Sequence, residues 1–201
     1  MIRVLLAEDQ AMVRGALAAL LALAGDIEVV AEAARGDEAV TRALETHPDV
    51  ALLDIEMPGG DGITATAALR AQLPACRVLI LTTFGRPGYL HRALEQGAIG
   101  FLLKDAPPTE LAAAVRRAAA GQRVVDPELA LSALSDGVSP LSKREREVLA
   151  AAKHGASVAD IAATLALSEG TVGNYLSVAM QKTGARNRIE AAHIAEEKGW
   201  L

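Results

Sequence analysis

Two kinds of segment alternate five times along the first half of the chain: short apolar runs bounded by turn residues, and longer segments with apolar residues three or four positions apart. The first kind is typical of buried strands and the second of helices that cover them. This alternation predicts an α/β domain in which helices cover both faces of a doubly wound parallel sheet. We expect its five strands at residues 2–7, 27–31, 50–53, 77–82 and 100–103.

Composition narrows the class of protein. The 201 residues leave room for one large or two small domains, and 51% of them are hydrophobic, enough for a core of Ala, Leu, Val and Ile. Cys76 is the only cysteine, which excludes an internal disulfide or a multi-cysteine metal site and fits a reducing compartment. Because the chain has no secretory start and no long apolar run, we expect a cytoplasmic protein with no membrane insertion.

Chemically useful side chains stand at the ends of the predicted strands. Glu8 and Asp9 follow the first strand and Asp54 the third, while Thr82 ends the fourth and Lys104 follows the fifth. In an open parallel sheet these ends form one edge, where ligands bind. Three neighbouring carboxylates repel one another unless a cation joins them, which favours Mg²⁺. Together with a hydroxyl and an ammonium, they suit phosphoryl transfer to a carboxylate.

Each of these residues also has an ordinary structural explanation. An aspartate at the end of a strand is commonly a turn or helix-capping residue, and Glu8 and Asp9 are placed to open the next helix. A lysine such as Lys104 is most often a solvated charge. The chemical interpretation therefore depends on the whole set.

In their order and spacing these residues resemble the receiver domain of two-component response regulators, over residues 1–122. The resemblance implies a flavodoxin-like strand order, with Glu8 and Asp9 as the acidic pair and Asp54 as the phosphoacceptor. It implies that a sensor histidine kinase transfers a phosphoryl group to Asp54 in a step that needs Mg²⁺. The three carboxylates and the backbone carbonyl of Glu56 would hold the metal.

The same resemblance assigns the remaining positions. Lys104 matches the lysine that contacts the phosphoryl group, Thr82 the switch hydroxyl, and Phe101, three residues before the lysine, the switch aromatic. On phosphorylation Thr82 and Phe101 would move inward and reshape the surface around the fourth helix and the fifth strand. One departure is Asp105, which stands where many receivers have a proline.

Residues 123–138 are predicted to link two domains, because the stretch is irregular and contains only a short helical pattern at 128–134. The net charge also changes here, from −6 over residues 1–138 to +1 over the remainder. The tail is therefore not strongly basic.

The tail, residues 139–201, is predicted to form a small all-α domain. Serines that can cap helices precede the first three of its four expected helices, and Gly155 and Gly184 stand where helices end. The short turn between the second and third helices favours a helix-turn-helix. The four helices are expected at 142–154, 157–166, 168–183 and 187–198.

The third helix of the tail carries the candidate DNA contacts. Its apolar stripe leaves Gly173, Asn174, Ser177 and Gln181 facing outward. Asn and Gln side chains can hydrogen-bond the edge of adenine, although a polar face also serves simply to keep a helix in solution.

The tail resembles the LuxR/FixJ-type DNA-binding domain, through residues 141–149, Leu167-Ser168, Thr171-Val172 and Asn187-Arg188. The resemblance implies binding to a double-stranded DNA operator. This family usually has a lysine or arginine at Gly173 and a histidine at Tyr175. Glycine costs a helix about 1 kcal/mol relative to alanine, and a missing cation removes one phosphate contact, so we expect a single tail to bind DNA weakly.

The predicted DNA contacts are Thr171, Gly173, Asn174, Ser177, Gln181, Lys182, Arg186 and Arg188, and further candidate phosphate contacts are Lys143, Arg144 and Lys153.

Together the two halves resemble the NarL/FixJ layout of response regulators. Short motifs, among them residues 54–58 and 197–200, resemble the DesR subgroup, which answers a membrane-fluidity sensor kinase and controls a lipid desaturase gene. The layout implies that phosphorylated receivers form a homodimer whose linked tails bind two half-sites, which compensates for weak single contacts. RNA polymerase is a further candidate partner.

Two other functions stay open. The first is a DNA-binding regulator that needs no phosphorylation and uses its receiver as an interaction module; the complete acidic set and Lys104 argue against it. The second is a Mg²⁺-dependent phosphatase, which usually places its nucleophile on the first strand beneath an insert, and neither feature is evident here. We therefore expect a transcription regulator and not an enzyme.

Overall fold

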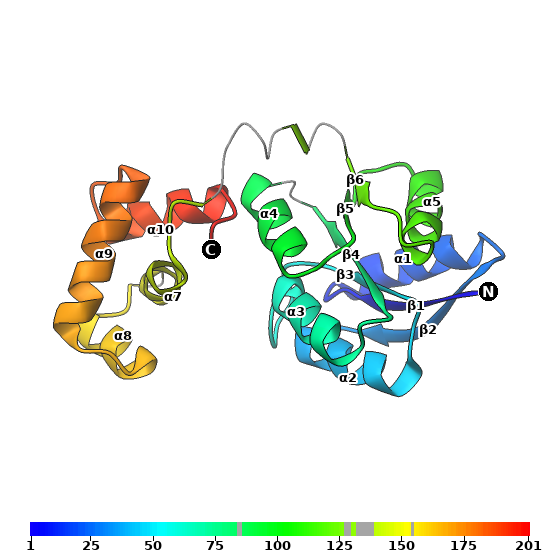
Figure 1. Cartoon of the computed structure of the whole chain (residues 1–201), viewed down its shortest axis with the longest axis horizontal. Coiled ribbons are helices and arrows are strands. Elements are labelled where there is room, and N and C mark those ends of the chain that lie inside the picture. The colour runs from blue at the N-terminus through cyan, green and yellow to red at the C-terminus, as the bar shows by residue number, and fades with distance from the viewer. Residues whose placement is uncertain (84–85, 127–129, 132–138, 154) are drawn as a thin grey trace. The chain divides into compact units, whose positions relative to one another are not determined.

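The computed structural model describes residues 1–83, 86–126, 130–131, 139–153 and 155–201 (Figure 1). The chain divides into two compact units, Met1–Gly85 with Leu90–Leu131 and Arg86–Tyr89 with Ser132–Leu201. Most of the predicted α/β domain lies in the larger unit, and the predicted helical domain lies in the smaller one. Most of the short helix predicted at 128–134 lies outside the described residues.

The described residues of the larger unit form one sheet of six parallel strands, in the order β2-β1-β3-β4-β5-β6. The predicted flavodoxin-like order is therefore confirmed. The strands are β1 (Ile2–Ala7), β2 (Ile27–Ala33), β3 (Val50–Leu53), β4 (Arg77–Thr82), β5 (Gly100–Leu103) and β6 (Val124–Val125).

The sheet differs from the prediction of five strands in one strand and one boundary. β6, inside the predicted linker, pairs with Gly100 and Phe101 of β5, and two residues are too few to show an alternation in the sequence. β2 continues to Ala33, two residues further than predicted, because Glu32 pairs with Leu6 of β1 although it interrupts the apolar run.

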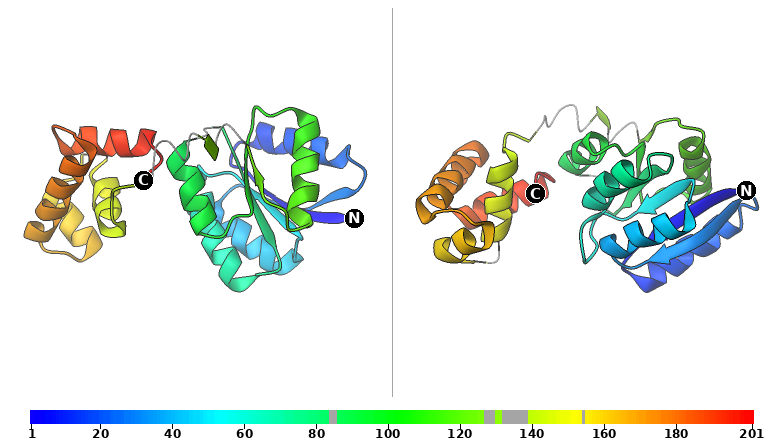
Figure 2. Two further views of the ribbon diagram at one scale, coloured as in Figure 1. Left: turned by 45° about the horizontal axis from the view of Figure 1, so that its top comes forward. Right: turned by 60° about the horizontal axis from the view of Figure 1, so that its bottom comes forward.

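Helices cover both faces of the sheet, as expected for parallel strands. Two of them, α1 (Ala11–Ala22) and α5 (Pro108–Ala119), lie on one face, and α2 (Gly36–Thr46), α3 (Gly62–Gln72) and α4 (Pro87–Glu95) lie on the other (Figures 1 and 2). The core beneath α1 and α5 joins Leu6, Leu52 and Leu79 of the sheet to Leu21 and Val115 of the helices. A sheet buried on both faces holds its strand ends rigidly, which positions the side chains that follow them.

The smaller unit contains the four predicted helices. Ser142 and Ser157 each form a capping box, and Ser168 caps the third helix through its hydroxyl. Gly184 ends that helix in the left-handed conformation, with φ of 70°. The helices are α7 (Lys143–Ala152), α8 (Val158–Leu165), α9 (Glu169–Thr183) and α10 (Arg188–Glu197).

The core of the smaller unit includes Val148, Ile161, Val172 and Trp200. Across the described residues, no helix combines the length and hydrophobicity that crossing a membrane requires.

Candidate functional site

The sheet brings the three predicted acidic residues together. β1 and β3 are neighbours, Ala7 pairs with Leu53, and the amide of Asp54 donates to the carbonyl of Ala7 over 2.9 Å. Carboxylate oxygens of Glu8, Asp9 and Asp54 consequently lie within 4.8 Å of one another. Glu8 is 1% exposed and Asp54 6%, whereas Asp9 faces solvent.

Lys104 completes this cluster from the end of β5. Its amide donates to the carbonyl of Thr82 over 2.8 Å, which fixes where its side chain begins. The ammonium lies 2.5 Å from Oε2 of Glu8 and 2.9 Å from Oδ2 of Asp54. One cation therefore bridges two buried anions that come from different strands.

Burial and charge act on the two members of this pair differently. Burial raises the pKa of Asp54, as does the charge of Glu8, and the bond from Lys104 only partly opposes them. Burial alone would lower the pKa of Lys104, but hydrogen bonds and charges from Glu8 and Asp54 outweigh it and raise the pKa. The pKa of Lys104 rises because its ammonium contacts two carboxylates, whereas Asp54 is buried and contacts one ammonium beside other carboxylates.

The cluster has the chemistry of a magnesium site. Three carboxylates gather here and the Lys104 ammonium pairs with two of them, Glu8 and Asp54. Carboxylate oxygens are the ligands that Mg²⁺ prefers. Oε2 of Glu8 is buried and, among the described residues, has no hydrogen-bond partner beyond its ion pair with Lys104. The residues therefore fit a divalent cation that Glu8, Asp9 and Asp54 would hold. The side chain of Glu56 is exposed, and only its backbone carbonyl was predicted as a ligand.

The two predicted switch residues lie on the adjacent strands. Thr82 ends β4 and is 1% exposed, and its partner across to β5 is Leu103. Phe101 pairs with Ile80 and is 0% exposed. The aromatic ring is thus inside the protein in this structure, with Thr82 at the same sheet edge as Asp54.

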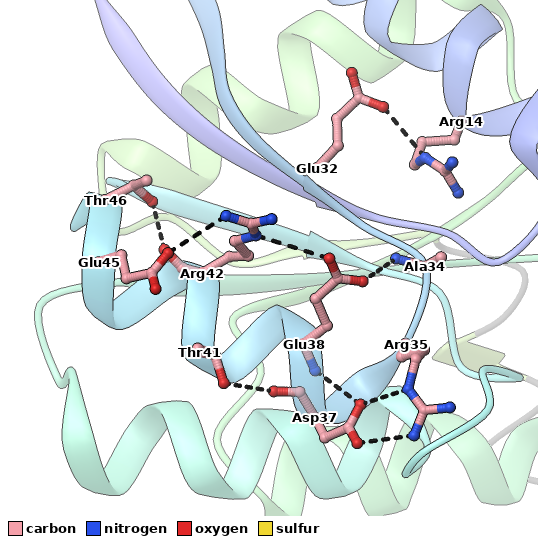
Figure 3. A network of polar contacts seen from close by, with 10 residues as sticks. All are labelled: Arg14, Glu32, Ala34, Arg35, Asp37, Glu38, Thr41, Arg42, Glu45 and Thr46. Carbon is pink, nitrogen blue, oxygen red and sulfur yellow. Dashed lines mark hydrogen bonds and ion pairs between the residues drawn. The ribbon is translucent and has the colours of Figure 1, made fainter.

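One residue of this region was not singled out from the sequence. Arg14, in the first turn of α1, donates over 2.6 Å to the backbone carbonyl of Glu8. It also donates over 3.2 Å to the carboxylate of Glu32 (Figure 3). It therefore fixes the backbone that carries the acidic pair. A contact to a backbone carbonyl leaves no pattern in the sequence, so no signal pointed to it.

In the smaller unit, α9 presents the predicted polar face. Val172, Leu176 and Ala179 are buried, whereas the side chains of Asn174, Ser177 and Gln181 are exposed. Gly173 is half-buried, and a Cβ added there would meet nothing within 4 Å in the described part of the chain outside the backbone of its own helix. The hydroxyl of Thr171 lies 2.8 Å from that of Ser168, at the start of the helix.

The predicted cations of this unit have different surroundings. The ammonium of Lys182 lies 2.9 and 2.7 Å from the two carboxylate oxygens of Glu145, so an ion pair ties α9 to α7. Burial opposes ionisation of Glu145, but the Lys182 ammonium and the Ser142 amide outweigh it and lower its pKa. Arg186 is exposed between α9 and α10, and Arg188 is half-buried at the first position of α10.

Three further cations were predicted as phosphate contacts. Arg144 pairs with Glu147 over 2.7 Å and Lys153 with Glu196 over 2.5 Å, so both take part in ion pairs within the unit. The side chain of Lys143 is exposed at the start of α7.

Comparison with known proteins identifies both units. Residues 4–116 match the response regulator receiver domain, and residues 139–195 match the LuxR family of bacterial regulatory proteins. Two curated relatives come from Bacillus subtilis (strain 168) and align over the full length of both chains. They are the transcriptional regulatory protein YvfU, which is described as uncharacterized and is 47% identical, and the transcriptional regulatory protein DesR, 44% identical.

A solved structure of RcsB dimers bound to DNA is 26% identical, covers 98% of both chains and has a TM-score of 0.66. With a matched receiver, a matched LuxR-type tail and relatives aligned over their whole length, the chain belongs to the LuxR family of two-component response regulators.

Proposed function

We propose that this chain regulates transcription under the control of phosphorylation. A sensor histidine kinase phosphorylates Asp54, phosphorylated receivers form a homodimer, and the paired tails bind a double-stranded DNA operator. The observation that carries the proposal is the ammonium of Lys104, 2.5 Å from Glu8 and 2.9 Å from Asp54. A receiver used only as an interaction module has no need for this buried and electrostatically costly cluster.

The two carboxylate oxygens of Asp54 have different hydrogen-bond partners. Oδ1 accepts a hydrogen bond from the amide of Ile55 over 2.8 Å, and Oδ2 faces Lys104. In the transfer, a carboxylate oxygen attacks the phosphorus as the bond to the histidine nitrogen of the kinase breaks, and its electron pair stays on the imidazole. The product is an acyl phosphate, whose new oxygens Lys104 and the Thr82 hydroxyl would bind. Bound Mg²⁺ would neutralise charge on the phosphoryl oxygens.

The domain limits that we propose follow the predicted ones, with a receiver over residues 1–122, a linker over 123–138 and a DNA-binding domain over 139–201. The pairing of β6 with β5 supports placing the first residues of the linker against the receiver.

We assign base contacts to the exposed face of α9 and phosphate contacts to the cations beside it. Asn174, Ser177 and Gln181 project from that face, and Arg186 and Arg188 follow the helix. Lys182 is bound by Glu145, so we expect it to hold α9 against α7 instead of contacting DNA. The RcsB dimers on DNA support a dimeric complex.

The test compares Asp54→Ala with Asp105→Ala, which removes an exposed carboxylate beside Lys104. Light scattering gives the mass of each protein with and without Mg²⁺ and beryllofluoride, a mimic of the phosphoryl group. We expect the wild type and Asp105→Ala to pass from monomer to dimer and to bind operator DNA more tightly, and Asp54→Ala to do neither. If the DNA affinity of Asp54→Ala still rises with Mg²⁺ and beryllofluoride, the regulator does not depend on a phosphoryl group at this residue.

The motifs shared with the DesR subgroup make membrane-lipid desaturation genes the first targets to examine. We expect phosphorylated protein to retard DNA from upstream of a desaturase gene more than DNA from within its coding region. Equal retardation of the two fragments would remove these genes from the proposal and leave the phosphorylation scheme unaffected.

A further inference from the structure

The loop between Asp54 and α3 is fixed at both ends by backbone hydrogen bonds. At its beginning, the amide of Asp54 bonds to β1, and at its end the amide of Gly62 donates to the carbonyl of Ile55 over 2.9 Å. The loop contains Glu56, whose carbonyl is the proposed fourth metal ligand. The position of this carbonyl therefore depends on what holds the middle of the loop.

The first turn of α2 holds the middle of the loop that follows Asp54. The amide of Gly36 donates to the carbonyl of Pro58 over 3.0 Å, and the amide of Asp37 donates to the carbonyl of Gly59 over 3.1 Å. The first amides of a helix have no partner within the helix, so these two are available to bind the loop. Two consecutive donors thus join the first turn of α2 to two consecutive carbonyls of the loop.

The two backbones approach so closely that only glycine fits at residue 36. A Cβ there would overlap the carbonyl oxygen of Gly60 and lie 2.8 Å from its carbonyl carbon. These are backbone atoms, which cannot turn aside as a flexible side chain does, so a side chain at residue 36 must push the loop away. By contrast, a Cβ at Gly15 of α1 would have no atom of the described residues within 4 Å apart from the backbone of its own helix.

Side chains around this junction are less important than the backbone contact. Arg35 and Asp37 form a two-bonded ion pair beside the start of α2, with distances of 3.0 and 2.9 Å (Figure 3). Their side chains are 52% and 57% exposed, however, and exposed ion pairs contribute little to stability.

We propose that Gly36 is a positioning residue for the phosphorylation site: by letting the first turn of α2 bind Pro58 and Gly59, it places the loop, and with it the Glu56 carbonyl, for the divalent cation. This inference rests on the proposed function of Asp54. Sites of this kind must be held within about 0.5 Å of their working geometry, which a displaced loop exceeds.

The experiment measures the dissociation constant of Mg²⁺ by titration calorimetry on the full-length protein, at a temperature where circular dichroism shows each variant to be folded. We expect Gly36→Ala to raise this constant about tenfold, the usual effect of losing a residue that supports a metal ligand. Gly15→Ala makes the same chemical change in another helix, where there is space, and should leave the constant unchanged. A merely structural role of Gly36 would lower the melting temperature without changing the affinity of the folded protein.

Two variants at residue 37 extend the test, in case Gly36→Ala fails to fold. Asp37→Pro removes the amide that binds Gly59, and proline is tolerated in the first turn of a helix. This variant should therefore weaken Mg²⁺ binding. Asp37→Ala keeps this amide but removes the ion pair with Arg35 and the bond that the carboxylate accepts from the Glu38 amide. It should not weaken Mg²⁺ binding.

The outcomes separate the two proposals. If the wild type itself binds no Mg²⁺, the metal-dependent step at Asp54 is wrong. If the wild type binds Mg²⁺ and the folded Gly36→Ala and Asp37→Pro variants bind it equally well, only the role of Gly36 is overturned. A loss of affinity in Gly15→Ala as large as in Gly36→Ala would overturn it too.

Discussion

The ammonium of Lys104 lies 2.9 Å from a carboxylate oxygen of Asp54, and the two side chains are only 11% and 7% exposed. Glu8, whose side chain is 1% exposed, lies against the same ammonium. Two buried carboxylates thus depend on one cation. Taking that cation away would leave two negative charges in a region that water hardly reaches, and such charges are costly.

Replacing Lys104 with methionine, which keeps most of the side-chain volume, should therefore lower the free energy of unfolding by about 3 kcal/mol. Added Mg²⁺ should raise the melting temperature of Lys104→Met more than that of the wild type, because it replaces the missing positive charge. Thermal unfolding with and without Mg²⁺ measures both effects.

Lys143→Met is the matched control, since the side chain of Lys143 is exposed on α7. It should change stability little and should respond to Mg²⁺ as the wild type does. Equal stability of the two variants would mean that Glu8 and Asp54 do not need Lys104.

The residues at the strand ends could be predicted from the sequence because their positions follow from the strand pattern alone. Once Asp54 and Lys104 are placed after β3 and β5, the parallel sheet itself brings them to one edge. The same reasoning predicted the capped helices of the tail, since Ser142 and Ser157 act within one turn of their own chain.

Contacts between residues far apart in the chain could not be predicted in this way. Lys182 binds Glu145, 37 residues away, and the first turn of α2 binds the loop after β3 through backbone groups. Neither the spacing of apolar residues nor a capping pattern in the sequence predicts either contact. From the sequence, Lys182 is predicted to contact DNA. Because of its ion pair with Glu145, we favour a role in holding α9 against α7.

Substituting Gly173 tests whether α9 is the recognition helix. Among the described residues, nothing outside the helix's own backbone lies within 4 Å of a Cβ at this position, so the Cβ of a lysine has space. Gly173→Lys should stabilise the tail by up to about 1 kcal/mol, because glycine is a poor helix former. It should also steepen the dependence of log affinity on log salt concentration by about 0.9, as one added phosphate contact does. Fluorescence anisotropy with operator DNA over a salt series measures this slope.

Gly15→Lys adds the same charge to α1 of the receiver at a position that is equally open. Its salt slope should equal that of the wild type. If the two variants bind DNA alike, the added cation acts through total charge, and the exposed face of α9 is not at the interface.

Lys182→Gln tests the role of the ion pair with Glu145. Because the ammonium is bound to both carboxylate oxygens of Glu145, its loss should lower the free energy of unfolding of the tail by about 1 to 3 kcal/mol. The salt slope for DNA should stay unchanged. Arg186→Gln, at an exposed position, should do the reverse, with a shallower slope and little change in stability. A shallower slope for Lys182→Gln would restore Lys182 as a phosphate contact.

The same ion pair should make the tail sensitive to acid. Lys182 and the Ser142 amide outweigh burial and lower the pKa of Glu145 below its ordinary value of 4.5. A carboxyl whose pKa is lower in the folded than in the unfolded state stabilises the protein fully above its unfolded pKa, and this stabilisation is lost as the pH falls through the folded value. The wild-type tail should therefore lose stability between about pH 5 and pH 3.

Glu145→Gln cannot ionise at this position, so it should be less stable than the wild type at pH 7 and should lose less of its stability on acidification. Trp200, the only tryptophan, lies in the core of the tail and reports urea unfolding at each pH by its fluorescence. Glu169→Gln, an exposed change at the start of α9, should keep the pH dependence of the wild type. If Glu145→Gln and the wild type lose stability in parallel from pH 7 to pH 3, acid sensitivity arises from other carboxyl groups, and Lys182 does not favour ionised Glu145.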